Sequence, residues 1–195
     1  MKQNLNLIMA GVGGQGNVLA SRIIGDAAVA AGYHVVIGET FGAQQRGGAV
    51  VSHVRLLKTE RYGPLIPAAS ADLIVGLEPF EVLKSAAVFL KPEGTVVTNE
   101  CPVMPSDRNY PALEDIFKAL KKISGQLFTL DSTAAAKKLG DVATSNMVMI
   151  GAAFASGMLP VEEAHLLKAI RDRFAEAAPL NLKAFEQGKK LVKPR

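Results

Sequence analysis

The residues best placed for chemistry are four glycines and a glutamine that follow an apolar run near the start of the chain. Gly11, Gly13 and Gly16 have G-x-G-x-x-G spacing, and Gly14 and Gln15 lie among them. Glycine is needed where φ is positive, or where a backbone or a phosphate approaches too closely for a Cβ atom. A helix after such a turn directs its free N–H groups and its positive dipole end at the turn. The pattern therefore predicts a site where an anion or another backbone comes close.

The same glycine spacing is found in dinucleotide-binding proteins. Glu39 follows Gly16 by about 20 residues, at the end of a predicted second strand, where those proteins keep the acid that binds ribose. An NAD- or FAD-binding oxidoreductase that works on its own is therefore one hypothesis. In the alternative, the glycines only allow tight packing between strand and helix, and Glu39 is a solvated acid. The spacing alone does not separate the two.

A second glycine-rich segment carries Gln45, Arg46, Gly47 and Gly48 between two predicted strands. The guanidinium of Arg46 is a rigid fork of donors suited to carboxylate or phosphate. Because strand ends line the crevice in which open α/β sheets bind ligands, we expect this loop to approach the glycine turn. Asn146, at the start of a later predicted helix, is either a cap or a further contact of the same site. The alternative for the loop is a Gly-Gly turn with an exposed arginine.

Composition and residue spacing exclude several other classes. The histidines at 34, 53 and 165 are far apart and Cys101 is the single cysteine, so we expect no metal site and no disulfide. No nucleophile elbow or P-loop ending is present, and no catalytic residue can be named. A net charge of +4 without tryptophan argues against nucleic-acid binding. The longest uncharged stretch is interrupted by polar residues, so we expect no membrane span and a cytoplasmic protein.

The elements that position these residues follow from apolar patterns, glycines and prolines. Strands alternating with helices predict a three-layer α/β/α sandwich with a largely parallel sheet, a helical C-terminal third and one domain over residues 1–195. The run 49–57 has apolar and polar residues on both faces, which predicts a sheet edge or a surface that meets another chain. The predicted strands are 5–9, 34–39, 49–57, 73–76, 95–98 and 127–130, and the predicted helices are 19–31, 79–89, 112–122, a short one capped by Asp131 or Ser132, 146–156, 160–174 and 180–191.

Several segments, in order along nearly the whole chain, resemble the gamma subunit or gamma domain of 2-oxoacid:ferredoxin oxidoreductases. Within that family the resemblance is strongest to the small beta subunit of indolepyruvate:ferredoxin oxidoreductases. The segments are GVGGQG (11–16), QRGG (45–48), SHVR (52–55), PLIP (64–67), ADLIVGLEP (71–79), SNMVMIGA (145–152) and NLKAFEQG (181–188).

The resemblance implies a subunit of a complex that oxidatively decarboxylates a 2-oxoacid, forms an acyl-CoA from coenzyme A and reduces ferredoxin. Thiamine diphosphate and the iron–sulfur clusters are then expected in a large partner subunit, with no cofactor held by this chain alone. One cysteine is too few for a cluster, which needs about four thiolates. A purely structural subunit remains an alternative, and a homodimer is expected for the isolated chain if its partner-facing surface is apolar.

One departure concerns the residues before the arginine loop. Many members of the family carry Tyr-Gly or His-Gly there, whereas this chain has Phe41-Gly42. A phenol or imidazole that could hydrogen-bond a partner or ligand is therefore missing. Indolepyruvate, or another arylpyruvate, is implied as substrate by the overall likeness alone.

Overall fold

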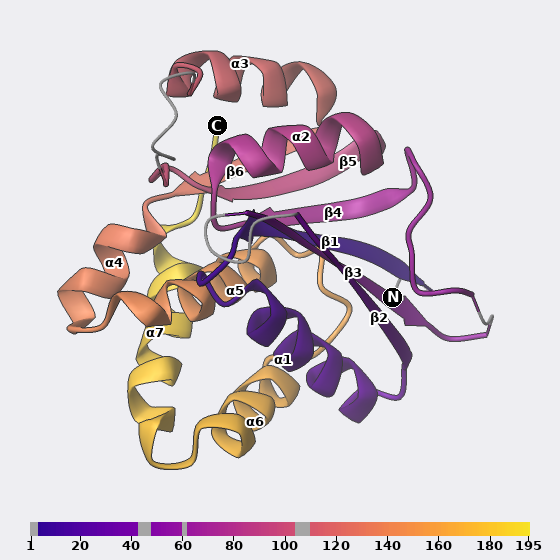
Figure 1. Cartoon of the computed structure of the whole chain (residues 1–195). Coiled ribbons are helices and arrows are strands. Elements are labelled where there is room, and N and C mark those ends of the chain that lie inside the picture. Colours follow the sequence, from indigo (N-terminus) through magenta and orange to yellow (C-terminus); the bar gives the residue numbers. More distant parts are fainter. Residues whose placement is uncertain (1–3, 43–47, 60–61, 104–109) are drawn as a thin grey trace.

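A computed structural model describes residues 4–42, 48–59, 62–103 and 110–195 and has a seven-stranded sheet with helices on both faces (Figure 1). The three-layer prediction is confirmed. The strands are β1 (Leu5–Val12), β2 (His34–Phe41), β3 (Ala49–Leu57), β4 (Ala71–Gly76), β5 (Leu90–Asn99), β6 (Gln126–Leu130) and β7 (Lys193–Pro194). The helices are α1 (Asn17–Ala30), α2 (Pro79–Phe89), α3 (Leu113–Ile123), α4 (Ser132–Leu139), α5 (Ser145–Ala155), α6 (Glu163–Phe174) and α7 (Ala178–Leu191), with short 3-10 turns at Val142–Thr144 and Ala175–Ala177.

The sheet has the strand order β2-β3-β1-β4-β5-β6-β7. Strands β1, β4, β5 and β6 pair in parallel, whereas β3 pairs antiparallel with both β1 and β2, and β7 pairs antiparallel with β6. After β1 the chain forms β2 and β3, which lie on one side of β1 in the strand order. After β4 it forms β5 and β6, which lie on the opposite side. The carboxyl ends of β1 and β4 therefore form the topological switch point, where open α/β sheets bind ligands.

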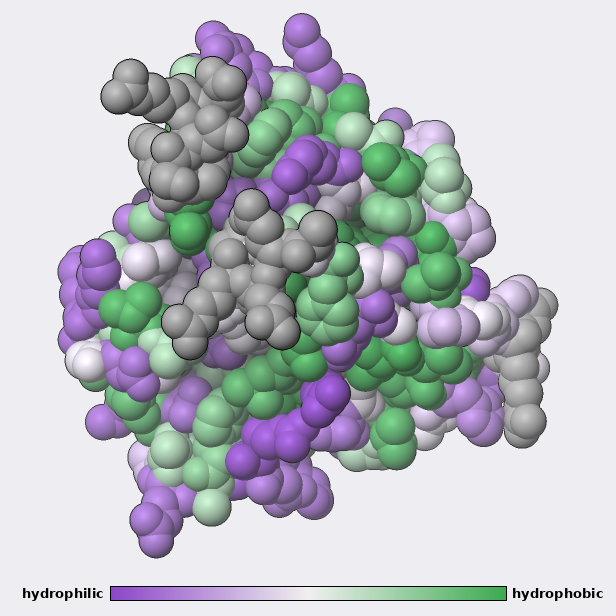
Figure 2. All heavy atoms as spheres, in the orientation of Figure 1, coloured by the Kyte–Doolittle hydropathy of each residue, from purple (hydrophilic) through white to green (hydrophobic). Residues whose placement is uncertain are grey.

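Two hydrophobic cores lie on opposite faces of the sheet. Alternate residues of β1 supply them: Leu7 and Met9 belong to the core beneath α1 and α5, and Ile8 and Ala10 to the core beneath α2 and α3. From Leu7 to Val12 this central strand has no polar side chain, because both of its faces are covered. Helices α6 and α7 pack outside α1 and α5 (Figure 1). On the face seen in Figure 2, hydrophobic residues gather around and below the middle and hydrophilic residues occupy most of the rim.

The prediction that 49–57 forms a sheet edge is wrong. Strand β3 lies between β1 and β2, and its polar side chains Ser52, His53 and Arg55 are buried, the last two with hydrogen-bond partners elsewhere in the chain. His53 Nδ1 accepts the Ile66 N–H at 3.1 Å, and Arg55 donates to Asn6 Oδ1 at 3.1 Å. The edge strand is β2. Buried polar groups satisfied by distant residues look, in sequence, the same as exposed ones.

The C-terminal third is helical as predicted, but its last residues rejoin the sheet. Strand β7 pairs with β6, and the N–H of Arg195 donates to Leu127 O at 2.8 Å. The Arg195 guanidinium lies 4.2 Å from the centre of the Phe117 ring and contacts Glu100 and Glu114. Arg195 is thus held against the body of the protein.

Candidate functional site

The glycine turn after β1 is shaped by two residues with positive φ. Gly14 has φ +97° and Gly16 has φ +82°, a conformation that residues with a Cβ rarely adopt. Gly16 is also the N-cap of α1, and a Cβ there would lie 2.3 Å from Asn146 Nδ2 of α5. The turn is therefore close-packed against α5, and Asn146 fills the space that the absent side chain leaves.

Gln15 bridges the two strand ends at the switch point. Its Oε1 accepts the N–H of Val12 at 2.9 Å, and its Nε2 donates to Leu77 O at 3.1 Å. The N–H of Leu77 donates in turn to Ala10 O at 2.9 Å. A Cβ on Gly11 would lie 2.7 Å from the same Gln15 oxygen. Gln15 thus occupies the crevice between β1 and β4 with its own amide.

A buried polar network continues from there to the helices. Asn99, at the end of β5, donates to Leu77 O at 3.1 Å and to Thr133 Oγ1 at 3.0 Å, and its Oδ1 accepts the Ser132 N–H at 2.9 Å. The hydroxyls of Ser132 and Ser145 lie 2.8 Å apart. These bonds fasten the strand ends to α4 and α5, so the crevice has a rigid polar floor.

The acid at the end of β4 is bound internally as well. Glu78 is 2 % exposed; one carboxylate oxygen accepts the Glu81 N–H at 2.8 Å and caps α2, and the other accepts the hydroxyl of Tyr110. Burial and the adjacent Glu78 carboxylate raise the pKa of Tyr110, because both disfavour the phenolate. This pair therefore serves as a tie between α2 and the segment before α3.

A hollow of about 520 Å³ opens beside the glycine turn, between the first half of α1, the ends of β2 and β3, and α6. The first turn of α1 carries no acidic side chain and Gly16 supplies no side-chain cap. Asn17, 2 % exposed, has an Oδ1 atom without a hydrogen-bond partner among the described residues. Arg22 and Arg173 line the same hollow, and Phe41, 64 % exposed, forms part of its wall. A positive helix end, two guanidiniums and an aromatic face together suit a phosphate-bearing ligand.

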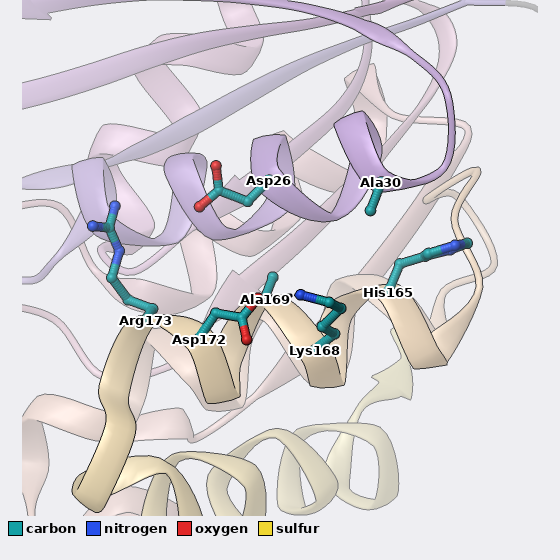
Figure 3. A pocket seen from close by; sticks show the side chains of 7 residues that line it. All are labelled: Asp26, Ala30, His165, Lys168, Ala169, Asp172 and Arg173. Atoms are coloured by element: carbon teal, nitrogen blue, oxygen red, sulfur yellow. Dashed lines mark hydrogen bonds and ion pairs between the residues drawn. The ribbon is translucent and has the colours of Figure 1, made fainter.

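A smaller hollow of about 270 Å³ lies between α1 and α6 (Figure 3). Asp26 and Ala30 face it from α1, and α6 contributes His165 at one end and Arg173 at the other. Lys168 is paired with Asp172 on the same helix. Charges of both signs balance along this seam. Its connection to the larger hollow is Arg173, which lines both.

Seven of the predicted site residues lie close together at the carboxyl end of β1. Gly48 accepts the Gly13 N–H at 2.9 Å, which places the start of β3 directly against the glycine turn. Gln45, Arg46 and Gly47 lie outside the described residues. The seven gathered residues are Gly11, Gly13, Gly14, Gln15, Gly16, Gly48 and Asn146.

Sequence reasoning missed Asn17, Arg22, Arg173 and Asn99. Arg22 lies six residues after Gly16 and one helical turn after Val18 and Leu19, which line the same hollow. Arg173 is contributed by α6, and no sequence pattern links that helix to the turn.

The topology argues against the dinucleotide hypothesis. In a dinucleotide-binding sheet, the strand that carries the ribose-binding acid is the parallel neighbour of the first strand. Here β3 occupies that place, and Glu39 lies on β2, one strand farther out. Its carboxylate is 3.9 Å from the Arg22 guanidinium.

Within the described residues, no three His, Cys, Asp or Glu side chains gather as a metal site would require. In the same part of the chain, every helix is too short or too polar to cross a membrane.

Residues 6–191 match the family described as pyruvate ferredoxin/flavodoxin oxidoreductase. The chain belongs to this family. Indolepyruvate oxidoreductase subunit IorB of Archaeoglobus fulgidus is 37 % identical over 94 % of this chain and 93 % of its own length. The common gamma subunit of the pyruvate and ketoisovalerate oxidoreductases of Pyrococcus furiosus is 30 % identical over 85 % and 84 %. The resemblance drawn from the sequence segments is thereby confirmed.

Solved structures of the family share the fold. The gamma subunit of a keto/oxoacid ferredoxin oxidoreductase from Geobacter sulfurreducens superposes with a TM-score of 0.71 at 25 % identity, over 95 % of this chain and 96 % of its own. The 2-oxoglutarate:ferredoxin oxidoreductase of Magnetococcus marinus, solved with 2-oxoglutarate, coenzyme A and succinyl-CoA, gives 0.73 at 24 % identity. There the match covers 97 % of this chain but only 31 % of the longer one, so this fold is one part of that polypeptide.

Proposed function

We propose that this chain is the small subunit of a 2-oxoacid:ferredoxin oxidoreductase that acts on indolepyruvate or a similar arylpyruvate. The observation that carries the proposal is the end-to-end similarity to four IorB subunits, at 34–37 % identity over 94–96 % of this chain. The complex would decarboxylate the 2-oxoacid, pass the released electrons to ferredoxin and transfer the acyl group to coenzyme A.

The cysteine content of this chain limits which cofactors of the complex it can bind. A cubane cluster takes four thiolates, and the chain has a single cysteine, Cys101, at the end of β5. The clusters would therefore belong to a large partner subunit, and the family resemblance supports the same location for thiamine diphosphate. The contribution of this chain would be to complete the assembly and to bind a part of a substrate.

We further propose that this part is the phosphate-bearing end of coenzyme A, held in the hollow beside the glycine turn. The N–H groups of the first turn of α1 point to the hollow without a capping side chain, and Arg22 and Arg173 add two charges. Charge-assisted bonds to phosphate are the strong class of hydrogen bond. The hollow, about 520 Å³, has the size of a small-molecule site.

The first test of the proposed function is purification of the tagged chain from its own cells. A large iron-containing partner should come with it, and the pair should reduce ferredoxin only with an arylpyruvate and coenzyme A both present. Recovery of the chain alone, saturably binding a nicotinamide or flavin, would instead support the dinucleotide hypothesis.

The coenzyme A site has its own test in the assembled complex. Arg22→Ala and Arg173→Ala should each raise the KM for coenzyme A about tenfold and leave the KM for the 2-oxoacid unchanged, because each removes a charge-assisted contact to phosphate. Lys168→Ala, a cation on α6 already paired with Asp172, is the matched control and should change neither. If the KM for coenzyme A were the same in the wild type and all three variants, the chain would have a structural role only.

A further inference from the structure

A long groove crosses α7 on the outer side of the molecule, away from the glycine turn. It consists of a hollow of about 460 Å³ between α4, β6 and α7, and a second of about 460 Å³ between α6 and α7. Leu139 and Gln187 line both hollows, so the two adjoin each other on the surface. We call this feature the α7 groove. Between Lys183 and Leu191, which lie at its two ends, the helix rises about 12 Å, enough for two turns of a bound helix or about four residues of a strand.

The floor of the α7 groove is apolar. Leu139, Leu167 and Leu182 are half-buried and pack on the core beneath them, and Leu191 is 39 % exposed. Apolar side chains in a hollow gain free energy when a partner covers them, at about 25 cal/mol per Å². The floor therefore favours a partner with apolar anchors.

The charges that line the groove are mainly positive. Five exposed cations lie along it, and in the described part of the chain none of them has a carboxylate within ion-pair distance: Lys138, Arg171, Lys183, Lys190 and Lys193.

The acids that share the groove are already engaged. Glu186 is 2.9 Å from Lys189, Glu100 is 3.4 Å from Arg195, and Asp131 caps α4 through the Ala134 N–H. The groove therefore carries a net positive charge, which is complementary to an acidic partner.

We propose that the α7 groove docks an acidic segment of the large partner subunit, one in which Asp and Glu alternate with apolar anchor residues. This inference rests on the proposed function for the existence of that partner. Leucines in the floor would take the anchors, and the five cations would steer the segment and fix its register. Two adjoining hollows in a row, each about 460 Å³, suit successive anchor residues of a polypeptide lying across α7.

The test exchanges charge on the groove of the full chain and measures assembly. Lys183→Glu with Lys190→Glu should lower recovery of the large subunit about tenfold, because two attractions become repulsions. The control is Lys118→Glu with Lys121→Glu on α3, which makes the same change in net charge on exposed residues of the opposite face. It should recover the partner as the wild type does. Unfolding midpoints of both doubles should match the wild type.

A second measurement identifies the segment itself. Carbodiimide joins lysines only to carboxylates in direct contact, so in the wild-type complex it should link Lys183 or Lys190 to Asp or Glu of the large subunit. Full recovery of the partner by the groove double would overturn the proposal and leave the proposed function standing. A wild-type chain that recovers no partner would instead count against the proposed function. The docking proposal would also be overturned if the wild-type chain captured nucleic acid and no protein, and if the variant with Lys183→Glu and Lys190→Glu no longer captured it.

Discussion

Gly16 has a positive φ and also lies very close to the side chain of Asn146, and each feature disfavours a larger residue. Its φ of +82° costs a residue with a Cβ about 1–2 kcal/mol, and the 2.3 Å approach to Asn146 Nδ2 adds an overpacking cost of about 1–3 kcal/mol. Gly16→Ala should therefore lower the free energy of unfolding by about 2–5 kcal/mol in urea titration.

Gly157 provides the matched control for that measurement. It has φ +74°, but a Cβ there would meet no described atom within 4 Å, so Gly157→Ala should cost only the backbone part, about 1–2 kcal/mol. Adding Asn146→Ala to Gly16→Ala should recover part of the loss. Equal losses at the two glycines would mean that Asn146 yields without cost and that the turn is not close-packed.

His53 makes stability depend on pH. Burial lowers the pKa of its imidazole below the ordinary 6.5, and Nδ1 must stay unprotonated to accept the Ile66 N–H. Below pH 6.5 the unfolded chain therefore binds a proton that the folded chain resists, so stability is full above that pH and falls as the pH drops. The slope from this residue should approach about 1.4 kcal/mol per pH unit in acid.

Urea titrations between neutral and acidic pH check this dependence. His53→Gln, which keeps an acceptor but does not titrate, should lose that part of the slope. His34→Gln, at an exposed histidine on β2, should retain it. The assignment would be wrong if both variants followed the wild-type curve.

Among the elements, α5 and α7 cross with their backbones in contact. A Cβ on Gly188 would lie 1.8 Å from Val148 O, and a Cβ on Gly151 would lie 2.0 Å from Phe185 O. Backbone cannot rotate away as a side chain can, so Gly188→Ala must push the helices apart. We expect a loss of at least about 3 kcal/mol in the free energy of unfolding.

Gly25 in α1 is the control for this crossing. Its nearest contacts are side-chain atoms, Ile37 Cδ1 at 3.1 Å and Val35 Cγ1 at 3.3 Å, which can shift. Alanine also gains about 1 kcal/mol of helix propensity over glycine, so Gly25→Ala should stay within about 1 kcal/mol of the wild type. A similar small effect for Gly188→Ala would show that the α5–α7 crossing tolerates separation.

The same contacts mark what the sequence could and could not predict. Glycines, prolines and apolar runs located the strands and most helix ends, because those signals are local. The order of strands is not local: the hairpin of β2 and β3 places β3 beside β1, and the alternating residues of 49–57 carry no sign of it. The candidate site likewise has a part that the sequence predicts and a part that it does not. The turn from Gly11 to Gly16 was predictable from spacing, whereas its contact with Asn146 depends on how α5 packs.

For the whole molecule, the two edges of the sheet differ. The outer edge at β7 is two residues long and contains Pro194, which cannot donate a hydrogen bond. The edge at β2 is eight residues long. Because the Gly42 N–H donates to Ala49 O at 2.7 Å, the alternate residues Val35, Ile37 and Glu39 point their backbone groups outward. Such an edge is a template for another strand.

We therefore expect the isolated chain to form a dimer in which β2 pairs antiparallel with β2 of a second copy. Glu39→Pro removes an outward N–H but no bond of the β2–β3 ladder, so sedimentation should show a monomer with an unchanged unfolding midpoint. Thr40→Pro removes a ladder donor instead and should lower that midpoint, because the bond to β3 is lost. A wild-type chain that stays monomeric at the highest attainable concentration, or a Glu39→Pro chain that dimerises as the wild type does, would show that β2 is left unpaired.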